Sequence, residues 1–250
     1  ECLVGSEMCI RDRSVTFELK AGAGDAKLGD NIIKNGDFAA SEAAESWNSA
    51  AGESVVSVAA EEEEIADSGL KTYGVLTRNQ ETATPGDCFS QDITDAVEKG
   101  ETYKFSFWAK LSDDYKDAPE EQRNVEFAPF YVSGGEATYL GSYSAGILSG
   151  DCTKTLKAGE WTKYEGTFKI PKAADQVVIR IIEQGTNYGQ GDCVKGTYYV
   201  TGVSMNKIER EKPSIEKDIP DWKESVKAAL GNDVVAGTAC LLYTSDAADD

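Results

Sequence analysis

The stretch TYKFSFWAKL, residues 102–111, places an apolar side chain at every second position. One face of this stretch carries Tyr103, Phe105, Phe107, Ala109 and Leu111. A period of two is that of a β-strand, in which successive side chains point to opposite sides. The stretch therefore predicts a strand with one buried face, and it leaves Trp108 on the opposite, more polar face.

Short runs of similar character lie on both sides of this stretch. SVTFELK (14–20) also alternates, and four later runs are rich in β-branched and aromatic residues: VEFAPFYV (125–132), WTKYEGTFKI (161–170), QVVIRIIEQ (176–184) and TYYVTGVSM (197–205). Clusters of Gly, Asn, Asp and Pro separate them. Short, regularly spaced strands without helices between them predict an all-β fold, an antiparallel β-sandwich of the jelly-roll type.

The composition excludes several classes of partner. The chain has 250 residues, of which 44 are acidic and 25 basic, so its net charge is −19. An acidic surface repels phosphate backbones, and we therefore expect no nucleic-acid partner. No run approaches the roughly 18 apolar residues of a membrane-spanning helix, so we expect no membrane partner either.

The chain contains no histidine. Its absence excludes Ser-His-Asp and Cys-His catalysis and histidine-ligated metal sites. Only carboxylates, Tyr, Lys and Cys remain for chemistry, and no motif pairs two acids as an acid–base couple would require. We therefore expect that this chain is not an enzyme.

Three cysteines lie in the body of the chain: Cys88, Cys152 and Cys193. None belongs to a CxxC pair, so the sequence does not indicate a zinc site or a thioredoxin-like site. Two of the three could form one disulfide. We favour the alternative, three partly buried free thiols.

Both ends of the chain differ in character from its centre. CLVGSEMCIRDR (2–13) and CLLYTSDAADD (240–250) back-translate naturally into adaptor sequence left by transposon-based sequencing libraries, and we exclude them from fold reasoning. The expected organisation is an adaptor-derived segment (1–13), a leading strand and connection (14–30), a β-sandwich (31–205), a charged linker (206–220), a helix and strand that begin another domain (221–239), and a second adaptor-derived segment (240–250).

Four stretches resemble the carbohydrate-binding modules of families 4, 9 and 22. They are NIIKNGDF (31–38), CFSQDITDAVEKGETYKFSFWAKL (88–111), AGEWTKYEGTFKIP (158–171) and TYYVTGVSM (197–205), and they occur in the family's order. In addition, DIPDWKESVKAALGNDVVAGTA (218–239) resembles the first helix and strand of family 10 glycoside hydrolases, the endo-1,4-β-xylanases.

The two resemblances together imply a function. They imply a non-catalytic module that holds an attached endo-xylanase on xylan or a related plant cell-wall β-glycan, raising the effective substrate concentration. The alternative is a non-binding β-sandwich spacer that stabilises or positions the catalytic domain. The resemblance also implies a secreted or cell-surface monomer, tethered to its catalytic domain.

The resemblance places sugar-binding candidates near the end of one predicted strand. Glu183 matches a strand-end glutamate that contacts sugar in family 22 modules; the alternative is a solvated carboxylate. Gln184, Asn187 and Tyr188 follow in a Gly-flanked loop, where they could hydrogen-bond or stack on a sugar, or form an ordinary loop. Alternation puts Arg180 on the strand face opposite Glu183, where it would bind ligand or pair with a surface acid.

Aromatic side chains elsewhere are candidate stacking platforms. The resemblance offers a stacking residue at Tyr131 or Phe130, and we prefer Tyr131. Trp108 could be a platform on its polar face, or be partly covered by a neighbouring strand. Two further tyrosines, Tyr139 and Tyr143, are candidates for the rim of the site. Trp161 belongs to a strand that is a signature of the fold, and we assign it to packing.

The resemblance includes two features from which this sequence departs. Arg78 matches an arginine that precedes the QDIT-like turn, but ETATPGDC (81–88) stands where the family has a stacking Trp. Many relatives hold a structural Ca²⁺ near the first strand, which implies Asn35 and Asp37 as ligands here. The closing strand has Thr201-Gly202 where Asp-Asp is usual, so one expected ligand is missing.

Overall fold

The strand predicted over residues 102–111 forms as expected, and it lies at the centre of the larger of two sheets. This strand, β5 (Thr102–Leu111), buries the five side chains of its apolar face and leaves the others partly or fully exposed. The computed structural model describes residues 27–39, 46–48, 56–79, 87–141, 144–183 and 193–209. The two adaptor-derived segments and the expected start of a second domain lie outside these residues, as does the linker from residue 210 onward. The expected start of the linker at residue 206 is wrong, because residues 206–209 continue the closing strand (Gly196–Glu209) and pair with its neighbours.

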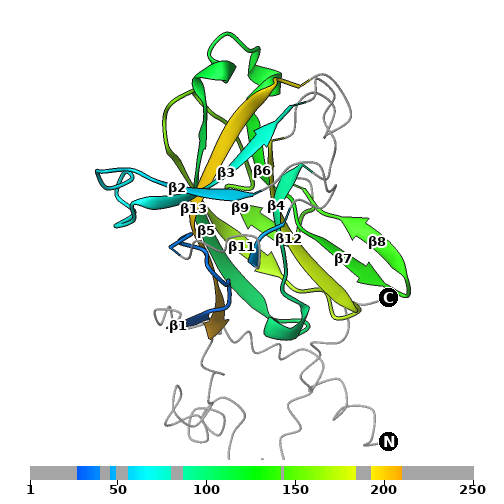
Figure 1. The fold of residues 1–250 in the computed structure, drawn as a ribbon. Helices are drawn as coiled ribbons and strands as arrows, with labels where there is room; N and C mark the ends of the chain where they lie inside the picture. Colours follow the sequence, from blue (N-terminus) through cyan, green and yellow to red (C-terminus); the bar gives the residue numbers. More distant parts are fainter. Residues whose placement is uncertain are drawn as a thin grey trace, which may run out of the picture. The chain divides into compact units, whose positions relative to one another are not determined.

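The larger sheet has seven strands, and every paired strand in it is antiparallel. Its strands are β2 (Ser57–Ala60), β3 (Thr72–Arg78), β13 (Gly196–Glu209), β5, β11 (Thr162–Lys169) and β9 (Leu148–Gly150), in that spatial order, with β1 (Lys27–Asn31) also paired to β13. In Figure 1 the β2–β3 hairpin projects to one side of the molecule.

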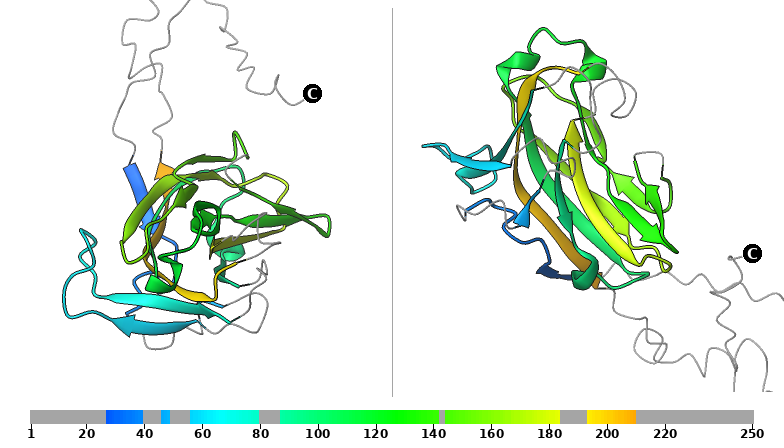
Figure 2. Two further views of the ribbon diagram at one scale, coloured as in Figure 1. Left: turned by 90° about the horizontal axis from the view of Figure 1, so that it is seen from above. Right: turned by 45° about the vertical axis from the view of Figure 1, so that its right-hand side comes forward.

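The smaller sheet has six strands and is also antiparallel. Its strands are β10 (Thr153–Thr155), β6 (Asn124–Phe127), β12 (Gln176–Glu183), β7 (Phe130–Ser133) and β8 (Glu136–Tyr139), and β4 (Cys88–Asp92) pairs with the other edge of β12. The β7–β8 hairpin projects on the side opposite the β2–β3 hairpin (Figure 1; Figure 2, right).

The short connections include three single turns of 3₁₀ helix within the described residues: η1 (Thr94–Ala96), η2 (Asp113–Tyr115) and η3 (Glu120–Gln122). The stretch from residue 112 to 123 thus forms two short turns. Tyr115 of η2 is fully buried, so this connection is anchored to the core. None of the described segments is a helix long and apolar enough to cross a membrane.

The core lies between the two sheets and is rich in aromatic rings. Phe105 of β5 stacks on Phe127 of β6 with 4.0 Å between ring centroids, and Phe107 stacks on Tyr164 at 4.4 Å. Fully burying a side chain of this size contributes about 1.5–3 kcal/mol. Alternation along β5, β6 and β11 thus delivers aromatic side chains to one shared interior, and the predicted antiparallel β-sandwich is confirmed.

The three cysteines of the described residues, Cys88, Cys152 and Cys193, are buried and unbridged. Burial raises the pKa of the Cys152 thiol to about 11. This thiol therefore stays protonated at neutral pH, and the prediction of three free thiols is confirmed.

Candidate functional site

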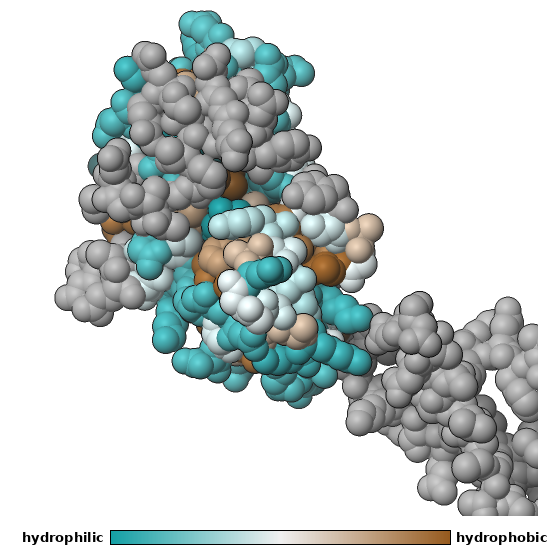
Figure 3. Space-filling view, turned by 90° about the vertical axis from the view of Figure 1, so that its right-hand side faces the viewer, coloured by the Kyte–Doolittle hydropathy of each residue, from teal (hydrophilic) through white to brown (hydrophobic). Residues whose placement is uncertain are grey.

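The candidate site is the outer face of the six-stranded sheet, called here the β12 face. Along β12, Val177, Ile179 and Ile181 enter the core, so Val178, Arg180 and Ile182 point outward. Outward neighbours come from five other strands: Ser90 of β4, Glu126 of β6, Phe130 of β7, Tyr139 of β8 and Thr153 of β10. Figure 3 shows the side of the molecule where β7 and β8 lie, with apolar residues gathered among hydrophilic ones.

An arginine and two aromatic rings form the centre of this face. Phe130 lies opposite Val178 on one side and opposite Tyr139 on the other, and the two rings are 5.3 Å apart. The guanidinium carbon of Arg180 lies 5.5 Å from the Phe130 ring and 4.9 Å from the Tyr139 ring. Arg180 Nε also donates to the carbonyl of Ala128 at 2.9 Å. Cation–π attraction and this hydrogen bond hold the guanidinium against the sheet.

Tyr139 is the most exposed large aromatic residue of the described chain, at 56%. A ring fixed in a sheet and open to solvent can stack on the apolar C–H face of a sugar at little cost in conformational entropy. The sequence predicts Tyr139 at the rim of the site. The structure places it on the edge strand β8 of the sheet, beside Arg180.

Polar groups surround this aromatic centre. Glu126 lies opposite Ile182, and Ser90 lies opposite Arg180, and both side chains are almost fully buried on the outer face. The Ser90 hydroxyl donates to Asn48, whose Oδ1 is 2.6 Å away. None of Glu126, Ser90 and Asn48 was predicted from the sequence. Alternation within VEF (125–127) would have identified Glu126, because it stands between two core residues.

Glu183 and Arg78 are paired with each other inside the protein. Arg78 Nη1 donates to Glu183 Oε2, and Nη2 donates to the Glu183 carbonyl at 2.7 Å. The Tyr115 hydroxyl is 3.4 Å from Glu183 Oε2, and Asp87 is 3.9 Å from Arg78 Nε. Neither Arg78 nor Glu183 is exposed. The interpretation of Glu183 as a solvated carboxylate is therefore wrong, and these two residues join the ends of β3 and β12.

The preference for Tyr131 over Phe130 needs correction. Tyr131 lies opposite Val177, a core residue, and packs against the core. Phe130 is the residue that points outward, because side chains alternate along β7. Arg180 does lie on the face opposite Glu183, as alternation predicted. Its described contacts on this face are the two rings and the Ala128 carbonyl.

The two tryptophans of the sequence analysis lie on the opposite side of the sandwich. Trp108 points outward from β5 and is partly exposed, with Lys163 6.0 Å from its ring. Trp161 packs, as assigned, but on the outer surface: its ring lies 5.7 Å from Tyr73 and 6.4 Å from Tyr199. Neither tryptophan belongs to the β12 face. Four candidates, Gln184, Asn187, Tyr188 and Tyr143, lie outside the described residues.

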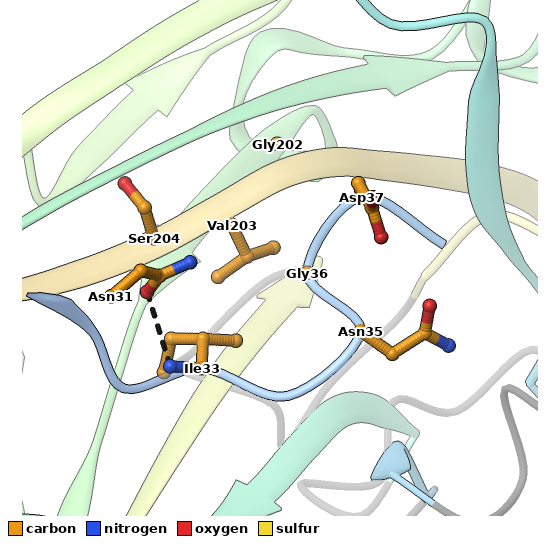
Figure 4. Close-up of a pocket in the computed structure, with 8 residues that line it drawn as sticks. All are labelled: Asn31, Ile33, Asn35, Gly36, Asp37, Gly202, Val203 and Ser204. Atoms are coloured by element: carbon orange, nitrogen blue, oxygen red, sulfur yellow. Dashed lines mark hydrogen bonds between the residues drawn. The ribbon is translucent and has the colours of Figure 1, made fainter. Parts of the chain in front are cut away.

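The expected calcium ligands Asn35 and Asp37 lie in one turn beside Gly202 and Val203 of β13 (Figure 4). The backbone carbonyls of this turn are already hydrogen-bonded. The Asn35 carbonyl accepts from Trp47 Nε1 at 3.0 Å, and the Gly36 carbonyl accepts from the Val203 amide at 2.9 Å. Asp37 Oδ1 accepts from the Ala39 amide.

Calcium requires about six to eight oxygen ligands. In the part of the chain that is described, no group of three or more His, Cys, Asp or Glu side chains could hold a metal ion. The turn offers Asp37 as its carboxylate. These residues alone therefore do not fit a complete calcium site, and structural calcium stays a prediction.

The fold and the β12 face define a class of protein, a β-sandwich module that presents aromatic and hydrogen-bonding side chains on one sheet. The family model of the carbohydrate binding domain, CBM_4_9, matches residues 30–189. This is more than half of the chain, and the chain belongs to this family of carbohydrate-binding domains. It is accordingly a non-catalytic carbohydrate-binding module, as the sequence analysis predicted.

Solved structures show the same fold. The CBM22-1 xylan-binding domain of Paenibacillus barcinonensis Xyn10C is 18% identical with a TM-score of 0.52, over 74% of this chain and 99% of that domain. The CBM22-1–CBM22-2 tandem of the same protein is 17% identical with a TM-score of 0.52, over 76% of this chain and 48% of the tandem. A further xylan-binding domain of CBM family 22 is 14% identical with a TM-score of 0.50, over 76% of this chain and all of that domain.

At these identities the likeness shows the fold alone, and it supports the predicted jelly roll. No curated protein matches the chain.

Proposed function

We propose that the β12 face binds a β-linked plant cell-wall glycan, and that xylan is the first ligand to test. The observation that carries this proposal is the exposed Tyr139 ring, held beside Phe130 and Arg180 on the outside of a sheet. The rings provide stacking surface, and the buried Arg180 side chain fixes their position from the sheet side. The structural neighbours described above are xylan-binding domains, which supports the choice of ligand.

The spacer alternative predicts a different surface. A module that only separates domains would present Lys, Glu and Thr on its sheet faces, without aromatic platforms. The paired rings of Phe130 and Tyr139 favour binding instead. With few anchoring residues on an open face, the affinity should be modest, about −4 to −7 kcal/mol.

The test is isothermal titration of the chain with xylohexaose and cellohexaose. We expect xylohexaose to bind, and Tyr139→Ala to weaken binding by about tenfold or more because stacking is lost. Leu28→Ala, which removes an exposed apolar side chain from β1, is the control and should leave binding unchanged. Absence of heat with both sugars from folded protein would reject the proposal in favour of the spacer.

We further propose that the module is tethered to a secreted endo-xylanase. The resemblance of residues 218–239 to the first helix and strand of a family 10 hydrolase supports this, and so does the location of plant cell-wall polymers outside cells. Sequencing the source DNA downstream of codon 239 tests it. A reading frame that continues into a (β/α)₈ barrel with two catalytic carboxylates is expected, and any other continuation would contradict the tether.

Structural calcium is proposed only as an addition to this function. Thermal unfolding with and without EDTA tests it, since an ion bound to the native state raises the melting temperature. Calcium that stabilises the chain, with an effect lost in Asp37→Asn, would support a site at this turn. A melting temperature that EDTA does not change would exclude it.

A further inference from the structure

The outer face of the seven-stranded sheet, called here the β5 face, is basic although the chain is acidic. Strands β5, β11 and β13 form its centre. Their outward charged residues are Lys104, Lys110, Lys163, Lys169 and Glu165. Four lysines therefore face two glutamates here, Glu165 and the Glu61 that pairs with Lys110, in a chain with 44 acidic and 25 basic residues. The sign of the charge is inverted on this face.

A carboxylate already lies between two of these lysines. Glu165 Oε1 is 3.1 Å from Lys163 Nζ and 3.7 Å from Lys104 Nζ. The hydrogen bond from Lys163 and the charge of Lys104 hold the pKa of Glu165 below its ordinary value. All three side chains are 45–48% exposed, so the ammonium groups remain accessible from solvent.

Four aromatic rings lie on the same face. Trp108 is directly opposite Lys163 in the β5–β11 pairing, and its ring is partly exposed. Two residues along β5, the Lys110 ammonium lies 4.7 Å from the Trp161 ring, 5.1 Å from Tyr199 and 5.7 Å from Tyr73. Lys110 also donates to Glu61 at 2.8 Å. Its charge is thus held within the ring cluster, whereas Lys163 lies beside Trp108 and shares Glu165 with Lys104.

Exposed rings and lysines together suit one kind of ligand. The face of an aromatic ring stacks on the C–H face of a sugar, and an ammonium group pairs with a carboxylate. A neutral glycan could stack on the rings, but it would form no ion pair with the lysines. A sugar that carries a carboxylate would use both.

We propose that the β5 face is a second carbohydrate-binding surface, and that it takes glycans bearing uronic acids. The sugar ring would stack on Trp108, and its carboxylate would be paired by Lys163 and Lys104. This surface lies on the opposite side of the sandwich from the β12 face and works independently of it. This proposal rests on the proposed function in one respect only: the choice of a carbohydrate as the ligand follows from the family to which the chain belongs.

The test compares two ligands that differ in charge alone. One is a xylo-oligosaccharide with a single glucuronic acid side chain, and the other is the same oligosaccharide after reduction of its carboxyl group. In titrations of the full chain at 20 mM NaCl, we expect the acidic ligand to bind about five- to tenfold more tightly, as two exposed ion pairs would provide. At 200 mM NaCl the preference should shrink because of screening.

Variants then locate the preference. Lys163→Gln replaces an exposed side chain with little risk to folding and should remove most of the preference, as should Trp108→Ala. Tyr139→Ala, on the β12 face, should lower the affinity for both ligands equally and keep the preference intact.

Any of three results with the sugar ligands would overturn the inference: equal affinity for the two ligands in the unmodified chain, a preference that survives Lys163→Gln, or a preference that only Tyr139→Ala removes. Equally tight binding of a single-stranded oligonucleotide of similar length would also overturn it, since this would indicate a site for polyanions in general. Failure of the β12 proposal is distinguishable, because it would appear as a neutral ligand that binds but is indifferent to Tyr139→Ala.

Discussion

At the scale of single residues, the Arg78–Glu183 pair is the most consequential contact in the interior. Both side chains are fully buried, and Tyr115 and Asp87 lie beside them. A buried ion pair adds little net stability to the fold, because the cost of desolvating two charges offsets their attraction. Loss of one partner is different, because it leaves a single charge buried without compensation.

Arg78→Met should therefore destabilise the chain by about 3–5 kcal/mol. The double variant Arg78→Met/Glu183→Leu should recover part of this loss, because it removes both charges of the pair and leaves only Asp87 without the arginine. Urea unfolding followed by tryptophan fluorescence measures both values. Lys157→Met, which breaks the exposed pair with Glu160, is the control and should change the free energy of unfolding by less than about 1 kcal/mol. A double variant no more stable than Arg78→Met would contradict this account.

Single residues also show where sequence reasoning succeeds. Alternation correctly placed Arg180 and Glu183 on opposite faces, because residues separated by an odd number of positions in a strand point to opposite sides of the sheet. It could not show that Glu183 meets Arg78, since the two are 105 positions apart and the contact depends on how the sheets stack. The choice of Tyr131 failed for a related reason: Phe130 and Tyr131 are equally apolar, and only the pairing with Val177 and Val178 decides which one faces inward.

At the scale of elements, the turn at residues 35–37 is tightly packed against β13. A Cβ atom on Gly36 would lie 2.0 Å from the carbonyl oxygen of Val203. The Gly36 carbonyl also accepts the Val203 amide, at 2.9 Å. Glycine at this position therefore permits a backbone-to-backbone contact between the turn that follows β1 and strand β13.

Gly36→Ala should destabilise the chain by about 1–3 kcal/mol, because the turn must move away from β13. Thermal unfolding should show this as a melting temperature lower by about 2–4 °C per kcal/mol. Gly29→Ala is a matched control in β1, where the nearest atom to an added Cβ is an ordinary 3.5 Å away. An equal decrease in melting temperature in the two variants would show that contact with β13 is not the cause of the destabilisation.

The positions of the strands could be predicted, because alternation depends only on residues that are close together in the sequence. The runs around 102–111, 161–170, 176–184 and 197–205 all contain strands close to their expected bounds. The order of those strands in two sheets was not predictable from periodicity, because β5 lies between β13 and β11, which are far from it in sequence. For the same reason, the composition of the β12 face, drawn from six strands, could be only partly predicted.

At the scale of the whole molecule, the net charge of −19 opposes compactness through mutual repulsion. Salt screens this repulsion, with a Debye length near 10 Å at 0.1 M. We expect the melting temperature to rise between 10 and 200 mM NaCl, and KCl at equal ionic strength should have the same effect. A melting temperature that falls with salt would indicate that attractive ion pairs outweigh the repulsion.

The buried thiols Cys88, Cys152 and Cys193 have a consequence for where this module can exist. Small secreted domains commonly depend on disulfides, and hence on an oxidising compartment. Here Lys27–Glu209 forms one compact unit, large enough to bury a substantial core, and its described cysteines are not cross-linked. The described unit therefore reaches its fold without a disulfide among these three cysteines, and it does not require an oxidising compartment for that purpose.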